Sequence, residues 1–211
     1  MANLIKTVFL DALGTLVRLQ PPWIGLRRAL GDGVDERRLI AAVKAEMSYY
    51  KEHSHEGRDA ESLADLRERC AAVLSDQLGR EVSAATLIGA IRFDPFPDAE
   101  PALAELRSRG LSLWCVSNWD ISLGDVLERA GLASMLDGVL TSAAAGARKP
   151  DPAIFARALE QAGCSAAEAV HVGDTPEEDV SGARAAGIRT LLIDRDGGGD
   201  VRSLEEVAER L

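Results

Sequence analysis

Four short polar stretches of the sequence come directly after or between apolar runs, and each carries a residue type that can do chemistry. A carboxylate at the end of a buried strand is unfavourable unless a cation or a hydrogen-bond donor nearby uses its charge. Asp11 is such a carboxylate, because it follows the apolar run TVFL. The four stretches are DALGT at residues 11–15, Ser117-Asn118, Lys149-Pro150, and Gly173-Asp174 followed by Asp179.

Taken singly, each stretch also has an ordinary structural explanation. An acid after a strand is more often a helix cap than a catalytic residue. The pair SN suits a turn, KPDP suits a helix start with proline in the first turn, and GD suits a tight turn. Short motifs become informative only when their structural context fits. The elements around the four stretches must therefore decide their meaning.

Short apolar runs alternate with segments of helical period along most of the chain. Runs of four to six apolar residues bounded by Gly, Asp, Ser or Asn are typical of strands buried on both faces. The helical segments end at glycines, which favour the left-handed conformation that stops a helix. The alternation predicts an α/β fold with a doubly wound, Rossmann-like parallel sheet. The expected strands are 5–10, 111–116, 138–141, 169–172 and 188–193, and the expected helices are 98–109, 123–130, 151–162 and 176–186.

Residues 18–92 interrupt this alternation, because they contain no strand-like run. They predict four helices, at 22–30, 35–56, 59–78 and 83–91, with Asp35, Asp59 and Ser83 as N-caps. A helical block inserted after the first strand is expected over the carboxyl end of that strand, where open α/β sheets bind ligands. The sequence therefore predicts a cap domain at 18–92 and a core domain at 1–17 and 93–211.

Composition excludes several partners. The chain has 211 residues with 46% hydrophobic content and a formal charge of −10, and it has no basic run longer than a pair. This charge argues against nucleic acid or an anionic membrane as the main partner, although a local site for a small anion remains compatible with it. Three scattered cysteines and no leader-like segment predict a cytoplasmic protein with reduced thiols. Whether it is a monomer or a homodimer is left open.

In their order and context, the four stretches resemble the four motifs of the haloacid dehalogenase (HAD) superfamily, which consists mostly of phosphatases. FLDALGTL resembles motif I, LWCVSN motif II, ARKPDPAIF motif III and HVGDTPEEDVSGARAAG motif IV. The helical insert after motif I is similar to the cap of subfamily IA. The resemblance implies a hydrolase with a small, phosphorylated substrate.

The resemblance also implies a role for each matching residue. Asp11 would be the nucleophile, and Mg²⁺ would be bound by Asp11, the Leu13 carbonyl and Asp174. Lys149 and the Ser117 hydroxyl would contact the phosphoryl oxygens, so that Asp11, Ser117 and Lys149 form the catalytic set. The supporting residues would be Thr15, which braces the motif I loop, Asn118, and Asp179, which would hold a metal-bound water or orient the lysine.

The chain departs from the phosphatase pattern at Leu13. HAD phosphatases carry a second acid at this position, which protonates the leaving oxygen and then activates water. General acid–base help contributes about 10²–10⁴ in rate. Weak activity on ordinary phosphomonoesters is therefore expected, with acyl and aryl phosphates least affected.

Three alternatives follow from that departure. A 2-haloacid dehalogenase shares DA-x-GT and the Ser-Asn pair and needs no metal, but its fourth motif carries Ser or Asn in place of the two acids. A phosphonoacetaldehyde hydrolase would need a cap lysine, whereas Lys44 and Lys51 are expected to be solvated. A near-inactive scaffold would bind a phosphorylated ligand or a protein without turnover. Trp119 is interpreted either as a wall of the pocket or as a structural plug under the predicted cap.

Overall fold

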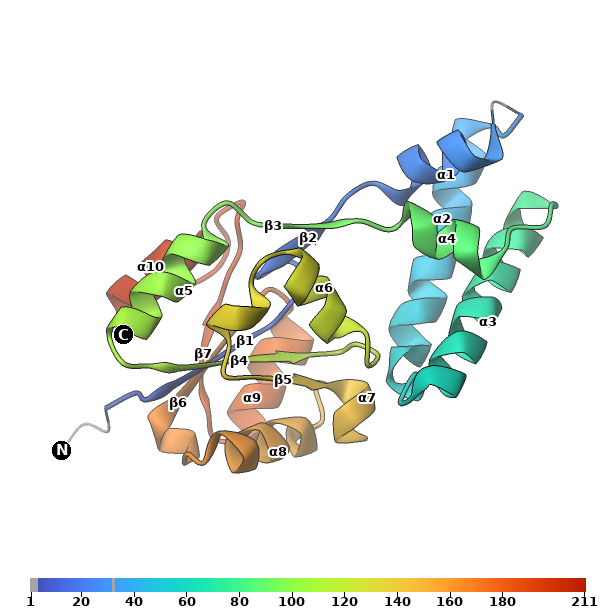
Figure 1. The fold of residues 1–211 in the computed structure, drawn as a ribbon. Helices are drawn as coiled ribbons and strands as arrows, with labels where there is room; N and C mark the ends of the chain where they lie inside the picture. Colours follow the sequence, from blue (N-terminus) through green and yellow to red (C-terminus); the bar gives the residue numbers. More distant parts are fainter. Residues whose placement is uncertain (1–3, 32) are drawn as a thin grey trace.

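The computed structural model describes residues 4–31 and 33–211, so residues 1–3 of the predicted core and residue 32 of the predicted cap lie outside it. A five-stranded parallel sheet has the order β5-β4-β1-β6-β7 and forms the centre of the larger lobe (Figure 1). Its strands are β1 (Thr7–Leu10), β4 (Ser112–Ser117), β5 (Gly138–Thr141), β6 (Ala169–Gly173) and β7 (Arg189–Leu192). All five expected strands are confirmed, and with them the α/β fold class.

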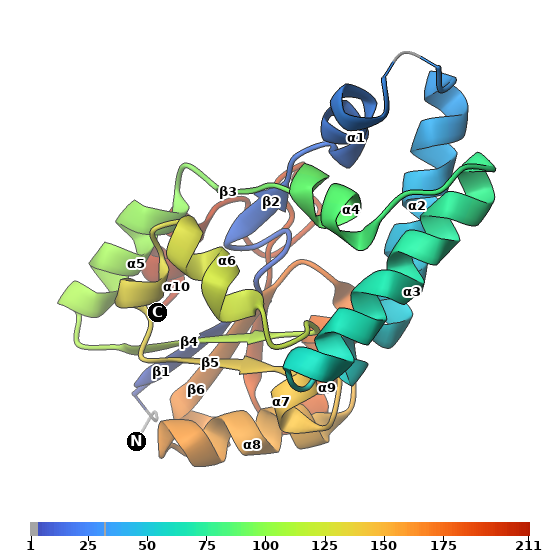
Figure 2. The same cartoon turned by 45° about the vertical axis from the view of Figure 1, so that its right-hand side comes forward.

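Helices cover both faces of this sheet. One face packs against α5 (Ala99–Ser108), α6 (Leu123–Arg129) and α10 (Leu204–Arg210). The other face packs against α8 (Pro152–Ala162) and α9 (Gly182–Ala185). Side chains of one strand alternate between these layers, as Val8 and Phe9 of β1 do, because successive strand residues point to opposite faces. Figure 2 shows α8 beneath the sheet and α5 and α10 on the opposite side.

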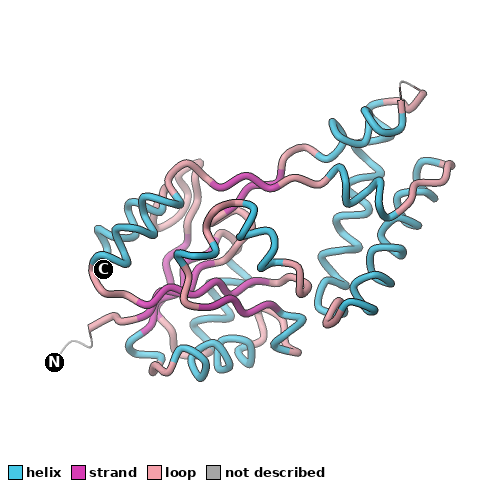
Figure 3. Tube along the Cα trace, viewed as in Figure 1, coloured by secondary structure: helices cyan, strands magenta, loops and turns pink. Residues whose placement is uncertain are grey.

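The remaining long helices form a separate group beside the sheet (Figure 3). They enclose their own apolar cluster, which includes Leu39, Leu66, Leu74 and Leu87. The three predicted N-caps are confirmed, since each side chain accepts a hydrogen bond from the backbone N–H three residues later. The group consists of α1 (Pro22–Leu30), α2 (Glu36–His53), the 3₁₀ turn η1 (Ser54–Glu56), α3 (Ala60–Leu78) and α4 (Ala84–Ala90). Its division from the core at 18 and 92 stays a prediction.

Three local features differ from the sequence-based expectation. The expectation of no strand in 18–92 is wrong at its edge, because β2 (Val17–Leu19) pairs antiparallel with β3 (Phe93–Pro95). Each of these strands is three residues long and carries one charged residue in its middle, so neither shows an apolar run. The expected continuous helix at 176–186 begins as a π-helix, η4 (Pro176–Ser181), and continues as α9. A short helix, α7 (Ser142–Ala145), follows β5 directly.

Two further 3₁₀ turns, η2 (Ala133–Met135) and η3 (Ala166–Glu168), lead into β5 and β6. Residues 196–200 form a loop, and α10 follows it. Among the described helices, none is both long enough and apolar enough to cross a membrane.

Candidate active site

Parallel strands bring the polar residues of three motifs to one edge of the sheet. Strand β1 lies between β4 and β6. Asp11 directly follows β1, Ser117 ends β4, and Asp174 directly follows β6. Because these strands are parallel, their carboxyl ends meet, and the strand order reverses on either side of β1. This edge is where open α/β sheets bind ligands.

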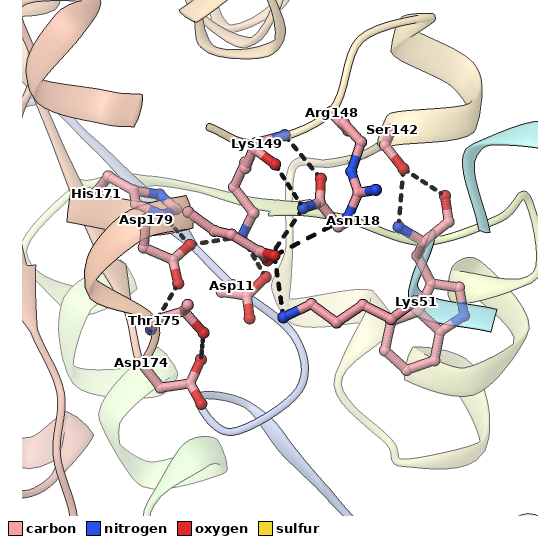
Figure 4. A network of polar contacts seen from close by, with 12 residues as sticks. Asp11, Lys51, Asn118, Ser142, Arg148, Lys149, His171, Asp174, Thr175 and Asp179 are labelled. Carbon is pink, nitrogen blue, oxygen red and sulfur yellow. Dashed lines mark hydrogen bonds and ion pairs between the residues drawn. The ribbon is translucent and has the colours of Figure 1, made fainter. Parts of the chain in front are cut away.

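Asp11 is almost completely buried and has one cationic partner. Its side chain is paired with the Lys149 ammonium, whose Nζ lies 2.6 Å from Asp11 Oδ1 (Figure 4). Burial raises the pKa of Asp11 above its ordinary value, although the Lys149 charge and the Ser117 hydroxyl oppose the change. The sequence predicted a cation or a hydrogen-bond donor beside this buried acid. The structure places Lys149 there, 138 residues away in the chain.

Lys149 is shared between two carboxylates. Its Nζ also donates to Asp179 Oδ1 at 2.5 Å, and its side chain is only 1% exposed. Burial alone would lower the pKa of Lys149, but the two carboxylates raise it above its ordinary value, so the ammonium stays charged. An ammonium has three N–H donors. Two are used by Asp11 and Asp179, and the third has no acceptor in the part of the chain that the structure describes.

Asp179 is held on both of its oxygens. Besides Lys149, Oδ1 accepts from His171 Nε2 at 2.8 Å, and Oδ2 accepts from the Thr175 backbone N–H at 3.0 Å. Burial alone would raise the pKa of Asp179, but Lys149 and the His171 hydrogen bond hold it well below its usual range. The close approach depends on Gly173, because a Cβ there would overlap the Asp179 carboxylate. Of the two roles considered for Asp179, orienting the lysine matches these contacts.

Asn118 fixes the backbone of Lys149 from both sides. Its Nδ2 donates to the Lys149 carbonyl at 2.9 Å, and its Oδ1 accepts from the Lys149 N–H at 2.8 Å. Thr15 is fully buried in the motif I loop, where its carbonyl accepts from Arg195 Nη2 at 2.9 Å. Its hydroxyl has no hydrogen-bond partner among the described residues. The bracing of this loop therefore runs through the Thr15 backbone.

Asp174 is the carboxylate that lacks a cation. Oxygens of Asp11, Asp174 and Asp179 lie within 4.8 Å of one another. In the described part of the chain, the Asp174 carboxylate accepts one hydrogen bond, from Thr175 Oγ1 at 3.3 Å, and forms no ion pair. Although the residue is partly open to solvent, partial burial and the charges of Asp11 and Asp179 raise its pKa to about 6. An oxygen-only cluster with uncompensated negative charge fits a hard divalent cation such as Mg²⁺.

Two further residues of motif I, Leu13 and Gly14, bear on the site. Gly14 has φ of 87°, and a Cβ there would overlap the Asp174 carboxylate, so both the turn and the close approach require glycine. Leu13 is 38% exposed, which is unusual for leucine in this structure. An apolar side chain therefore stands two residues after Asp11, and it offers neither a proton nor a base.

The helical group contacts the site edge through polar side chains that sequence reasoning missed. Tyr50 Oη donates to Asp120 Oδ2 at 2.8 Å, and Lys51 Nζ lies 3.0 Å from Glu178 Oε1. Glu178 in turn accepts from Asn118 Nδ2 at 3.1 Å. Lys51 is solvated as expected, since 61% of its side chain is exposed, and it also pairs with Glu178. Asp120 lies two residues after motif II and Glu178 lies within motif IV, so acidic residues next to the motifs were the available signal for these contacts.

A backbone hydrogen bond also joins the helical group to the sheet domain. The Ile121 N–H donates to the Gly57 carbonyl at 3.0 Å, which joins the η1 turn to the loop after motif II.

Trp119 is buried and its ring centroid lies 5.0 Å from that of Phe93. It belongs to the main apolar cluster of the core. Its burial in this cluster matches the interpretation of Trp119 as a structural plug.

Comparison with known proteins agrees with the motif resemblance. A family model described as haloacid dehalogenase-like hydrolase matches residues 5–187. The bovine (Bos taurus) haloacid dehalogenase-like hydrolase domain-containing protein 3 is 40% identical over 136 residues, which cover 64% of this chain and 49% of that protein. A phosphoserine phosphatase of Thermus thermophilus is 43% identical over 117 residues, covering 55% of this chain and 47% of that enzyme. The chain thus spans about half the length of these curated relatives.

Solved structures show the same fold. The L-2-haloacid dehalogenase of Xanthobacter autotrophicus superimposes with a TM-score of 0.76 at 24% identity, over 98% of both chains. A HAD phosphatase of Thermococcus onnurineus gives a TM-score of 0.68 at 24% identity, over 98% of this chain and 97% of the other. At this identity the likeness concerns the fold alone. The family match over most of the chain confirms the resemblance, and the protein belongs to the haloacid dehalogenase-like hydrolase family.

Proposed function

We propose that this protein is a Mg²⁺-dependent phosphohydrolase that transfers a phosphoryl group from a small, activated phosphate to Asp11. The observation that carries the proposal is the arrangement of charge at the sheet edge. One ammonium, Lys149, is shared by Asp11 and Asp179, while Asp174 stands beside them without a cation. The phosphatase-named relatives support the same class of reaction.

The metal would be held by Asp11, the Leu13 carbonyl and Asp174. Both oxygens of Asp179 already accept hydrogen bonds, so it would support the site without binding the metal directly. When bound, Mg²⁺ would neutralise charge on the phosphoryl oxygens and on the attacking carboxylate, which otherwise repel each other. Substitution of Asp174 by Asn should therefore weaken metal binding more than substitution of Asp179.

The chain's own residues would carry out the transfer. An Asp11 oxygen attacks phosphorus, the bond from phosphorus to the leaving oxygen breaks, and that oxygen departs with the electron pair. The free N–H of Lys149 and the Ser117 hydroxyl donate to the phosphoryl oxygens and stabilise the charge that is redistributed there. Asn118 keeps the lysine backbone in place. Water then attacks phosphorus, which releases inorganic phosphate and restores the carboxylate.

Leu13 limits which substrates can react. No acid at that position donates a proton to the leaving oxygen, which should lower the rate for alkyl phosphoesters by about 10²–10⁴. Acyl and aryl phosphates release their leaving groups as stabilised carboxylate or aryloxide anions, so they need less help from an acid. The apolar Leu13 side chain suits an apolar portion of such a leaving group.

Residues 18–92 would act as a cap that closes over the site. Tyr50 and Lys51 of α2 reach acids of the core, Asp120 and Glu178, and Arg148 Nη1 donates to the Glu52 carbonyl at 3.3 Å. Asp120 lies two residues after Asn118, and Arg148 directly precedes Lys149. Glu178 accepts a hydrogen bond from Asn118. Closure of such lids excludes water from the reaction.

The test is phosphate release from acetyl phosphate and p-nitrophenyl phosphate with Mg²⁺, comparing the wild-type protein with Asp11→Asn. Turnover is expected in the wild type, with acetyl phosphate the better substrate, and it should vanish in the variant and on addition of EDTA. Turnover that persists in Asp11→Asn would refute the nucleophile. Halide release from a 2-haloacid that survives EDTA would instead establish the dehalogenase alternative, which the missing acid at Leu13 favours and the two acids of motif IV oppose.

A further inference from the structure

His171 is a buried polar residue in an apolar layer of the core. It lies in β6, and the strand register places it beside Phe9 of β1, which is itself beside Trp114 of β4. Its imidazole is completely buried and makes an edge contact with the Phe155 ring, with centroids 4.9 Å apart. An aliphatic residue would fill this place at lower desolvation cost. A polar contact must therefore offset the desolvation cost of this buried imidazole.

Its polar contact points to the catalytic edge. Nε2 is 2.8 Å from Asp179 Oδ1, whereas the buried Nδ1 has no partner among the described residues. Asp179 is an acceptor, so Nε2 must carry the proton that forms this hydrogen bond. Among the described residues, the imidazole therefore hydrogen-bonds to one group, the Asp179 carboxylate, which also accepts from Lys149.

The Asp179 carboxylate is held at three points. Oδ1 accepts from His171 and from Lys149, and Oδ2 accepts from the Thr175 backbone. His171 thus takes part of the hydrogen-bonding capacity of the same oxygen that binds the lysine. Without this donor, Oδ1 would have Lys149 as its remaining partner and would draw the ammonium toward itself. The ammonium would then move away from Asp11 Oδ1, its other acceptor at 2.6 Å.

We propose that His171 is a positioning residue that sets the place of the Lys149 ammonium between Asp11 and Asp179, by sharing Asp179 Oδ1 with it. The consequence for catalysis rests on the proposed function, whereas the effect on Lys149 does not. A misplaced cation would contact the phosphoryl group poorly in the transition state. Misplacement by about 1 Å costs on the order of 10² in rate.

The lysine content of the chain allows a direct test that needs no turnover. There are four lysines, and Lys6, Lys44 and Lys51 are exposed while Lys149 is buried. In protein labelled with ¹⁵N-lysine, the Lys149 ammonium should give a slowly exchanging signal, which Lys149→Met assigns by its absence. His171→Gln retains a donor, whereas His171→Leu and His171→Phe remove it. Phe155→Leu is the packing control, because it loosens the contact with His171 and keeps its hydrogen bond.

The signal is expected to stay in place in His171→Gln and in Phe155→Leu, and to shift or broaden in His171→Leu and His171→Phe. His171→Phe preserves aromatic volume, so it guards against a leucine variant that fails to fold. A wild-type Lys149 signal in either folded donor-free variant would overturn the proposal. Loss of the signal in Phe155→Leu or in His171→Gln would also overturn it, since packing or ring shape alone would then explain the effect.

Kinetics provide the second arm. With acetyl phosphate, kcat should fall about 10-fold or more in the donor-free variants and recover in His171→Gln, while KM changes less than about twofold. Equal kcat in all His171 variants would overturn the catalytic part of the inference. If the wild type shows no turnover, the proposed function fails, and the ammonium signal still decides the role of His171.

Discussion

Glu46 is a carboxyl group buried between α2 and α3, and it should make the stability of the protein depend on pH near neutrality. The residue is 5% exposed. Burial raises its pKa from 4.5 to about 7, and a hydrogen bond with Cys70 offsets only part of the change. The folded protein therefore prefers the neutral acid. The stability that this preference supplies is fully present below pH 4.5 and is lost as the pH rises through about 7.

The size of the effect follows from the two pKa values. The difference between 4.5 and about 7, at about 1.4 kcal/mol per pH unit, amounts to about 3 kcal/mol when the group is fully charged. Glu46→Gln keeps the shape and a hydrogen-bonding amide but cannot ionise. Its free energy of unfolding relative to wild type should therefore increase by about 2–3 kcal/mol between about pH 5 and about pH 8.5.

Urea denaturation of the two proteins at both pH values measures this difference, because titrations common to both cancel. Trp23 lies against the apolar cluster of the cap helices, so its fluorescence follows the unfolding of that region. Glu52→Gln makes the same chemical change at an exposed position of α2 and is the matched control. A difference between Glu46→Gln and wild type that is the same at both pH values would refute the reasoning.

Three further substitutions test other parts of the structure. Leu13→Asp supplies the missing acid, so turnover of an alkyl phosphomonoester should rise by about 10², and that of p-nitrophenyl phosphate by less; no gain with the alkyl ester would mean that this acid is not the main deficit. Lys149→Met leaves two buried carboxylates unpaired, so urea denaturation should show a loss of about 3–5 kcal/mol without Mg²⁺, and an unchanged stability would contradict the buried ion pair. Tyr50→Phe removes the donor to Asp120, which should weaken the contact between α2 and the sheet domain by about 1–3 kcal/mol and speed amide exchange in the η1 turn; unaltered exchange there would mean that this hydrogen bond does not hold the helical group in place.

Most of the core could be predicted because its strands are apolar on both faces and its helices end at glycines. The residues of motifs I, II and IV could be grouped because parallel strands bring their carboxyl ends together, whereas Lys149 of motif III follows no strand directly and was grouped with them by the family resemblance. Strands β2 and β3 could not be predicted, since Val17–Leu19 and Phe93–Pro95 are too short and too polar to show a pattern. The π-helical turn at Pro176–Ser181 has the same acidic, helix-compatible sequence that an α-helix would have.

The contacts that sequence reasoning missed join distant parts of the chain. Tyr50 and Asp120 are 70 positions apart, and their hydrogen bond exists only once the cap helices dock on the core. His171 is hidden for a different reason. In the run AVHVG it reads as one residue of a strand, and its function becomes visible only when η4 turns Asp179 back against β6. Packing geometry, which no local pattern encodes, decides both.

The proposed reaction forms a phosphoryl group covalently bound to Asp11. This species should accumulate because Leu13 cannot act as the base that activates water. Without a base at this position, attack by water should be slowed by about 10²–10⁴ relative to an enzyme that has one. The most direct measurement is mass spectrometry of protein mixed with acetyl phosphate and Mg²⁺ and then quenched in acid. The account predicts one added phosphoryl group on the peptide that contains Asp11 and none in Asp11→Asn. A phosphoryl group on another residue, or none while phosphate is released, would contradict it.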